Sequence, residues 1–132
     1  MHYVHGARWW RWPVIAALTA TAAVHITLVP DHLREAPYAG VLFITLSAAA
    51  LGLAALLAVS DHQLAWLAAG ALSLAALLAY LASRSIGLPS LGDDVGDWLN
   101  PLGLVALPCE AAVAVVSWHT VSGRRWMSVN SG

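Results

Sequence analysis

Four long apolar segments, separated by short polar connections, constrain this chain more than any other feature of its sequence. They cover residues 13–30, 38–59, 64–83 and 101–119. A helix needs about 20 mainly apolar residues to cross the hydrocarbon core of a bilayer, with a lower limit of about 17. Each segment meets this requirement, and a chain with only 10% charged residues has too little polar surface for a water-soluble domain. The sequence therefore predicts an all-α integral membrane protein with four spans.

The connections indicate how the four spans are arranged. Residues 60–63 are too few for anything but a tight turn, so the second and third spans must run antiparallel. The two connections at the opposite end are residues 31–37 and 84–100. Pro30 is expected to end the first span, because proline lacks an amide hydrogen and clashes with the preceding helical turn. We therefore expect residues 1–132 to form one transmembrane domain, a four-helix bundle with up-down-up-down topology.

The distribution of arginine predicts the orientation of this bundle. Arg8, Arg11, Arg124 and Arg125 flank the spans at the end that holds both termini. At the opposite end Arg34 and Arg84 are outnumbered by five acidic residues: Asp31, Glu35, Asp93, Asp94 and Asp97. The positive-inside rule then places both termini in the cytoplasm. This predicts a multi-pass protein of the cell inner (plasma) membrane whose longer connections face outward.

Small residues repeat at four-residue steps on the second and third spans. The positions are Ala50, Ala54, Ala58, Ala71, Ala75 and Ala79. Such stripes allow helix backbones to approach closely in lipid. We expect these two spans to form a tight scaffold hairpin.

Two ionisable residues interrupt the apolar spans. Glu110 lies about nine residues into the fourth span, about 14 Å deep at 1.5 Å per residue. An ionised side chain at such a depth costs at least about 3 kcal/mol, so Glu110 should face the bundle. His25 occupies the same half of the antiparallel first span, and Arg84 can reach inward from the end of the third. The sequence predicts a buried polar cluster of His25, Arg84 and Glu110.

The cluster can have a purely structural role or can bind a ligand. Glu110 can be a protonated acid that bonds a neighbouring group and serves packing alone, and His25 a neutral imidazole on a backbone carbonyl. Alternatively, His25 and His32 can bind a transition metal such as copper or zinc together with Glu110 or Glu35, and His25, His32 and Glu110 are the candidate ligands. No other cofactor is indicated by the sequence.

Several classes of function are disfavoured. The chain has no lysine and a net charge of −1, so no basic surface exists for nucleic acid. Nucleophile-elbow, zinc-protease, phosphate-loop and C-x-x-C motifs are all absent from the sequence, which disfavours an enzyme. The polar residues of the outer connections are instead candidates for docking a partner: His32, Arg34, Glu35, Asp93, Asp94 and Asp97.

Two motifs resemble a known group of proteins. The chain reads S-R-S-I-G-L-P over 83–89 and N-P-L-G-L over 100–104, and H-L-R-E-A-P-Y-A-G-V-L-F over 32–43. These elements are similar to those of small bacterial four-span membrane proteins of unassigned function, in which a glutamate follows one to two turns into the fourth span. The resemblance implies a four-span topology and points to His25, His32, Arg84 and Glu110. Asn100 departs from it, because an acidic residue is expected before the proline.

These observations favour a non-catalytic binding or accessory subunit of a membrane complex, with other membrane proteins or further copies of itself as partners alongside the lipid bilayer. The alternative is a cofactor-binding, metal-binding or proton-relay protein that uses His25 and Glu110. A third and weaker alternative is an oligomeric channel or transporter subunit. Replacement of Glu110 separates the first two, since only the alternative requires its carboxyl group.

Overall fold

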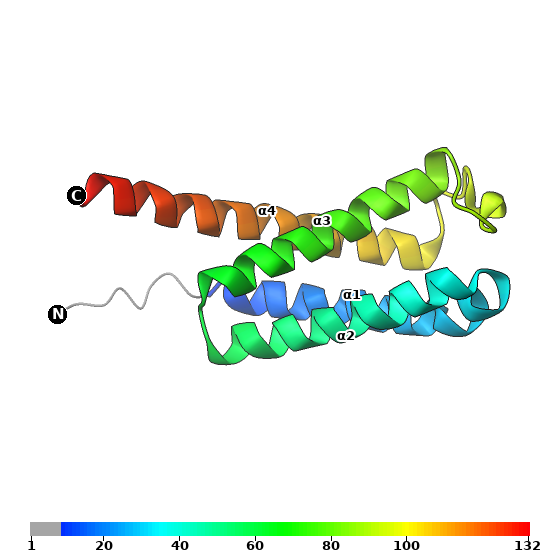
Figure 1. Cartoon of the computed structure of the whole chain (residues 1–132), viewed down its shortest axis with the longest axis horizontal. Coiled ribbons are helices and arrows are strands. Elements are labelled where there is room, and N and C mark those ends of the chain that lie inside the picture. Colours follow the sequence, from blue (N-terminus) through cyan, green and yellow to red (C-terminus); the bar gives the residue numbers. More distant parts are fainter. Residues whose placement is uncertain (1–8) are drawn as a thin grey trace.

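The structure, a computed structural model, describes residues 9–132 as four long helices and one short 3-10 turn. They are α1 (Arg11–Glu35), α2 (Pro37–Val59), α3 (Gln63–Ser85), η2 (Gly92–Asp94) and α4 (Pro101–Asn130). The four helices pack antiparallel to their neighbours (Figure 1). Each is long and apolar enough to cross a membrane. The expected all-α architecture with four spanning helices is therefore confirmed.

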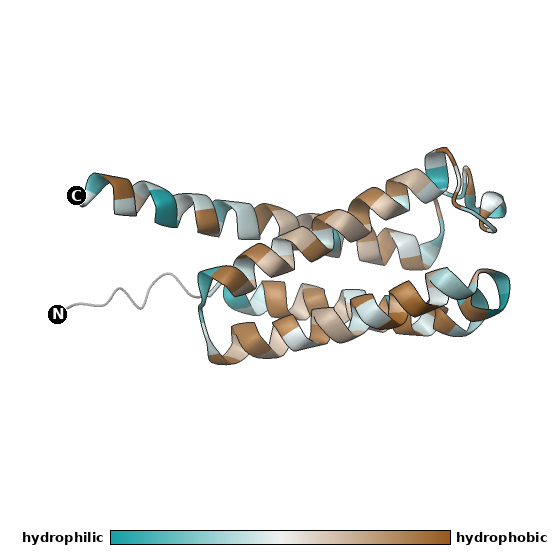
Figure 2. Cartoon of the chain, viewed as in Figure 1, coloured by the Kyte–Doolittle hydropathy of each residue, from teal (hydrophilic) through white to brown (hydrophobic). Residues whose placement is uncertain are grey.

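The bundle has two polar ends and an apolar body. The start of α1, the α2–α3 turn and the C-terminus lie at one end, which we call the terminal end (Figure 1). The α1–α2 corner and the connection from α3 to α4 lie at the other, the cap end. Hydrophilic residues gather at both ends, whereas the helix bodies between them are mostly hydrophobic (Figure 2). Of the residues used to predict orientation, Arg8 lies outside the described part of the chain.

Helix α1 does not end at Pro30, as the sequence predicted. It continues to Glu35, and Ala36 is the one residue between α1 and α2. A proline inside a helix frees the carbonyl four residues earlier, here that of Ile26, and membrane helices tolerate such a loss when neighbouring groups compensate. The connection predicted over 31–37 is therefore a helical turn followed by a sharp corner. Pro37 then suits the first turn of α2.

The helices associate mainly as two hairpins. Helix α1 packs most extensively on α2 and α3 on α4, and α1 also contacts α4, whereas α2 and α3 touch only slightly. Figure 1 shows the α1–α2 and α3–α4 pairs as two layers. The predicted tight hairpin of the second and third spans is therefore wrong. A short turn joins these two helices, but the even shorter corner at Ala36 brings α2 against α1.

The alanine stripe of α2 is buried against the bundle, whereas that of α3 is not. Ala50 and Ala54 are buried in the main core cluster with Leu18 of α1. Ala71, on α3, is exposed instead. Helix α3 buries a different face, formed by Ala65, Trp66, Ala69 and Ser73. Periodicity identified small residues on α3 but could not tell which of its faces meets the bundle.

Polar contacts fasten the terminal end. Asp61, in the α2–α3 turn, accepts a hydrogen bond from Trp66 Nε1 at 2.7 Å and lies 2.7 Å from Arg124 of α4. Arg124 also donates to the carbonyl oxygen of Asp61 at 2.9 Å. Trp66 is almost fully buried within the bundle. This contact ties the turn between the two hairpins to α4.

Candidate functional site

A histidine and a glutamate face each other inside the bundle. His25 Nε2 lies 3.8 Å from Glu110 Oε1, with His25 8% and Glu110 2% exposed. One comes from α1 and the other from α4, so the pair joins the two hairpins near the middle of the apolar body. Because the imidazole and the carboxyl group can each bind or release a proton, the pair can share or pass one.

The second imidazole nitrogen of His25 is held by its own helix. Nδ1 lies 2.8 Å from the carbonyl oxygen of Thr21, one turn earlier. A carbonyl oxygen only accepts, so Nδ1 carries a proton and donates it to Thr21. Nε2 is therefore the nitrogen left to interact with Glu110. This arrangement fixes the ring orientation and directs its free lone pair, or a second proton, toward the carboxyl group.

Phe43 of α2 separates the pair from His32. Its ring centroid lies 4.9 Å from that of His25 and 4.5 Å from that of His32. His32 Nδ1 is bonded to the carbonyl oxygen of Leu28 at 2.9 Å. Within residues 9–132 no group of three or more His, Cys, Asp or Glu side chains is placed to hold a metal ion. The predicted metal set of His25, His32 and Glu110 is therefore not assembled.

Arg84 belongs to a different cluster from the one predicted. Its guanidinium lies 2.9 Å from Asp94 Oδ1, donates to Ser83 Oγ and stacks over the Tyr80 ring at 4.9 Å from the centroid. The side chain is 10% exposed. Among the described residues no ion pair joins Arg84 to Glu110. A carboxylate in the adjacent connection meets the guanidinium without the cost of carrying it deep into the apolar body.

The connection over 84–100, which we call the cap, is a folded unit. Leu91 is buried with Ala36 and Ala39 against the α1–α2 corner, and Tyr38 donates a hydrogen bond to the Pro89 carbonyl at 2.6 Å. The amide of Gly96 donates to the Arg84 carbonyl at 2.9 Å and closes the loop. Gly96 has a φ of 85°, a region that favours glycine. The cap is thus fixed both to its own hairpin and to α1–α2.

Asn100, the departure from the expected acidic residue, has a clear structural role. Its side-chain oxygen accepts from the amides of Leu102 at 3.1 Å and Gly103 at 3.4 Å. It is the N-cap of α4, a position that asparagine and aspartate fill about equally well. Asn100 Nδ2 in turn donates to Asp97 at 3.3 Å. Asparagine at this position therefore caps the helix as an aspartate would, without adding a negative charge.

The docking candidates are distributed unequally over the cap end. Asp94 is committed to Arg84 and Ser83, and His32 is half-buried beneath Phe43. Arg34 lies 3.8 Å from Asp31, both highly exposed. The remaining acids face outward: Glu35, Asp93 and Asp97. Beside them the cap exposes four large apolar side chains, none of which the sequence analysis named as a docking candidate: Ile86 at 83%, Leu99 at 79%, Val95 at 46% and Trp98 at 41%.

A seam of buried small polar residues runs through the bundle, and it was also missed. Every long helix contributes to it: Thr21, Ser47, Ser73, Ser83 and Ser117. Ser47 Oγ donates to the Ala22 carbonyl at 3.3 Å and so joins α2 to α1. A hydroxyl group inside an apolar span does not by itself predict burial, because Thr19, Thr27 and Thr45 are exposed and bond to the carbonyl four residues earlier on their own helix.

No family model matches the sequence, and no curated protein or solved structure is significantly similar to it. The four spanning helices agree with the four-span architecture that the motifs implied. Membership of a particular family stays a prediction.

Proposed function

We propose that this protein is a non-catalytic accessory subunit of a membrane complex, and that the cap is the surface through which it binds its partner. The observation that carries the proposal is that a connection of this length is folded and fixed. The Arg84–Asp94 ion pair stabilises the connection internally. The buried Leu91 and the hydrogen bond from Tyr38 attach it to the other hairpin. A preorganised loop loses little conformational entropy on binding.

The exposed side chains of the cap indicate the chemistry of the partner. Asp93 and Asp97 point their charge outward together with Glu35, while Arg84 is neutralised by Asp94. Ile86 and Leu99 provide apolar surface next to these acids. Apolar anchors surrounded by charge of one sign suit a partner that is basic around an apolar recess. We therefore propose a membrane protein with a basic surface beside the cap.

Site-specific photo-crosslinking in native membranes tests this proposal. A crosslinking amino acid at Leu99 should yield one discrete heavier adduct, and Asp93→Lys combined with Asp97→Lys should abolish it. The matched control places the crosslinker at Leu42, an exposed position in the body of α2. Leu42 should give only lipid adducts or none. A Leu99 profile identical to that of Leu42 would contradict docking at the cap.

We also propose that both termini face the cytoplasm and that the membrane is the cell inner (plasma) membrane. Arg11, Arg124 and Arg125 lie at the terminal end, whereas Glu35, Asp93 and Asp97 lie at the cap end. The positive-inside rule supports this orientation, which directs the cap outward. A partner would then meet the cap on the outer side of the membrane.

A second candidate function rests on the His25–Glu110 pair. We propose, as the alternative, that this pair is a buried proton-binding site. The 3.8 Å separation places Glu110 opposite the free nitrogen of His25. His32, which is half-buried nearer the cap end, contacts the same Phe43 ring. The Phe43 ring lies between His32 and the pair, and no hydrogen bond among the described residues links His32 to His25, so this alternative rests on His25 and Glu110 alone.

Glu110→Gln distinguishes the pair from a packing contact, because glutamine keeps the shape of the side chain and cannot titrate. Difference infrared spectroscopy of reconstituted protein should show a pH-dependent carboxyl band that the variant lacks, and His25→Gln should shift that band. Proton uptake into proteoliposomes supplies the functional measurement. If both variants match the wild type in spectrum and uptake, the pair serves packing alone.

A further inference from the structure

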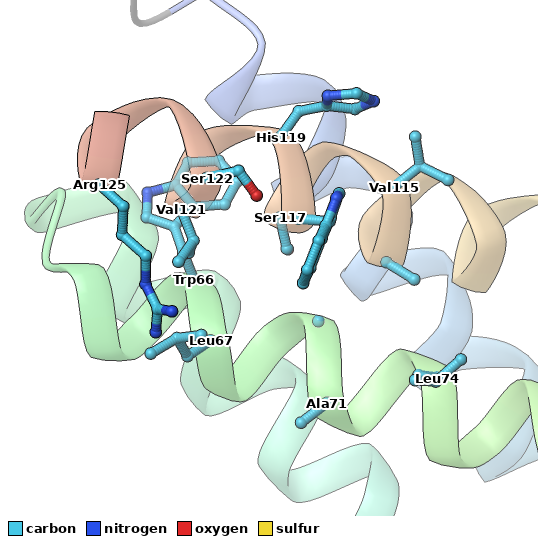
Figure 3. Close-up of a pocket in the computed structure, with 13 residues that line it drawn as sticks. Trp66, Leu67, Ala71, Leu74, Val115, Ser117, His119, Val121, Ser122 and Arg125 are labelled. Atoms are coloured by element: carbon cyan, nitrogen blue, oxygen red, sulfur yellow. The ribbon is translucent and has the colours of Figure 1, made fainter. Parts of the chain in front are cut away.

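A groove of about 530 Å³ lies between α3 and α4 in the half of the bundle near the terminal end (Figure 3). Its lining is mostly apolar and includes Leu67, Ala71 and Leu74 of α3 and Ala114 and Val115 of α4. The groove exists because small residues on both helices leave space that larger side chains would fill. In a membrane its open side faces lipid rather than water.

One cation stands at the polar end of this groove. Figure 3 shows the Arg125 side chain reaching from α4 toward Leu67 of α3. Its neighbour Arg124 is paired with Asp61, whereas Arg125 makes no ion pair with any residue between 9 and 132. Arg125 lies beyond the end of the span predicted over 101–119, where α4 is expected to reach the phospholipid headgroups. The groove is therefore an apolar surface with one unpaired positive charge at its polar end.

A buried hydroxyl lies one turn deeper. Ser117 packs directly against Gly70 at the base of the groove and is almost fully buried, and its Oγ has no hydrogen-bond partner among the described residues. Gly70 lies three residues beyond Leu67 on α3, about 4.5 Å further into the membrane at 1.5 Å per residue. Buried hydroxyl groups normally have a partner. The Ser117 Oγ is closed off from the groove as it stands, so a bound molecule with an acceptor just below its anionic group would supply a partner once this hydroxyl rotates toward it.

We propose that this groove binds one anionic phospholipid from the leaflet at the terminal end. The lipid phosphate contacts Arg125, a glycerol ester carbonyl accepts from Ser117, and one acyl chain lies along Ala71, Leu74 and Val115. The order of groups in the groove, a cation, then a donor, then apolar surface, matches the order of phosphate, ester and hydrocarbon in the lipid. Basic sites between spanning helices bind anionic lipids in this manner. The inference is independent of the partner proposed for the cap.

Native mass spectrometry of the detergent-solubilised protein tests the proposal with phosphatidylglycerol and phosphatidylcholine of equal chain length. We expect one phosphatidylglycerol per protein, retained about fivefold better than phosphatidylcholine, the factor expected for one cation at a lipid surface. Arg125→Gln should remove this preference, and Arg125→Lys should keep it. Arg34→Gln, which removes an exposed cation at the cap end, should have no effect.

A second pair of variants locates the acyl chain. Ala71→Leu fills the groove and should reduce retention of both lipids, whereas Ala55→Leu, at an exposed position on α2, should not. Unchanged thermal unfolding of each variant shows that the bundle is intact. Equal retention of the two lipids by the wild type, or a preference that survives Arg125→Gln, would overturn the proposal. Retention unaffected by Ala71→Leu would overturn the placement in the groove.

Discussion

At the scale of single residues, Gly40 shows how closely α1 and α2 approach. A Cβ atom at this position would lie 2.5 Å from the Leu33 side chain and 2.9 Å from the Leu33 backbone nitrogen. The side chain can move, but the backbone of a packed helix cannot do so without displacing the corner at Ala36. Gly40 therefore permits the contact that forms the first hairpin.

Gly40→Ala should destabilise the protein, because overpacking of a fixed contact costs about 1–3 kcal/mol. The matched control is Gly52→Ala on the same helix, where nothing lies within 4 Å of the added carbon. In a helix alanine is favoured over glycine by up to about 1 kcal/mol, so this control should be neutral or slightly stabilising. Thermal unfolding in detergent measures both. Equal behaviour of the two variants would show that the corner relaxes freely.

Sequence reasoning predicted the site unevenly at this scale. The cost of an ionised group in lipid was enough to turn Glu110 inward, and the antiparallel order of the spans was enough to place His25 in the same half. Arg84 and Trp66 could not be assigned, because their partners Asp94 and Asp61 are chosen by the three-dimensional path of the turns. The position of a residue along its span can be predicted from the sequence. The side chain that it contacts on another element cannot.

At the scale of elements, the cap depends on the Arg84–Asp94 pair. Asp94 lies in η2, and both its carboxylate and its carbonyl oxygen face Arg84. The run of aspartates and glycines over 92–97 gives no sign in the sequence that Leu91 beside it packs against the other hairpin. The prediction that the first helix ends at Pro30 was also wrong. Proline usually ends a helix, but here the residues beyond it pack against α2 and the helix continues.

Asp94→Asn should loosen the cap, because it removes the charge that neutralises Arg84, and a hydrogen bond to a charged group contributes about 1.5–3 kcal/mol. Limited proteolysis of the protein in nanodiscs should then cleave within residues 84–100 faster than in the wild type. Asp93→Asn is the control, since it removes an equal charge from an exposed neighbour. Cleavage that is equally fast in both variants would mean that net charge, rather than the ion pair, holds the cap.

At the scale of the whole molecule, hydropathy predicts the number of spans but not which helices pair. Four apolar segments of similar composition give no preference for one neighbour over another, and the alanine stripes suggested the wrong hairpin. The observed pairing follows from the corner at Ala36, from Gly40, and from the folded cap. The orientation in the membrane depends on charges at the ends and is open to direct measurement.

Cysteine labelling of intact cells tests the orientation. In a Cys109→Ser background, Asp93→Cys should react with a membrane-impermeant maleimide added outside, and Ser131→Cys should react only after permeabilisation. The expectation follows from the arginines at the terminal end. The opposite pattern would place the cap in the cytoplasm and reverse the orientation.

The contacts that lock the two hairpins at the cap end also set an order for assembly. Residues 36–39 meet the cap only when the connection between α3 and α4 has crossed to the same side of the membrane as the α1–α2 corner. A chain whose second hairpin has stalled during translocation leaves Leu91 uncovered and the Tyr38 hydroxyl without the Pro89 carbonyl. Closure of the cap therefore requires both connections to lie on the same side of the membrane.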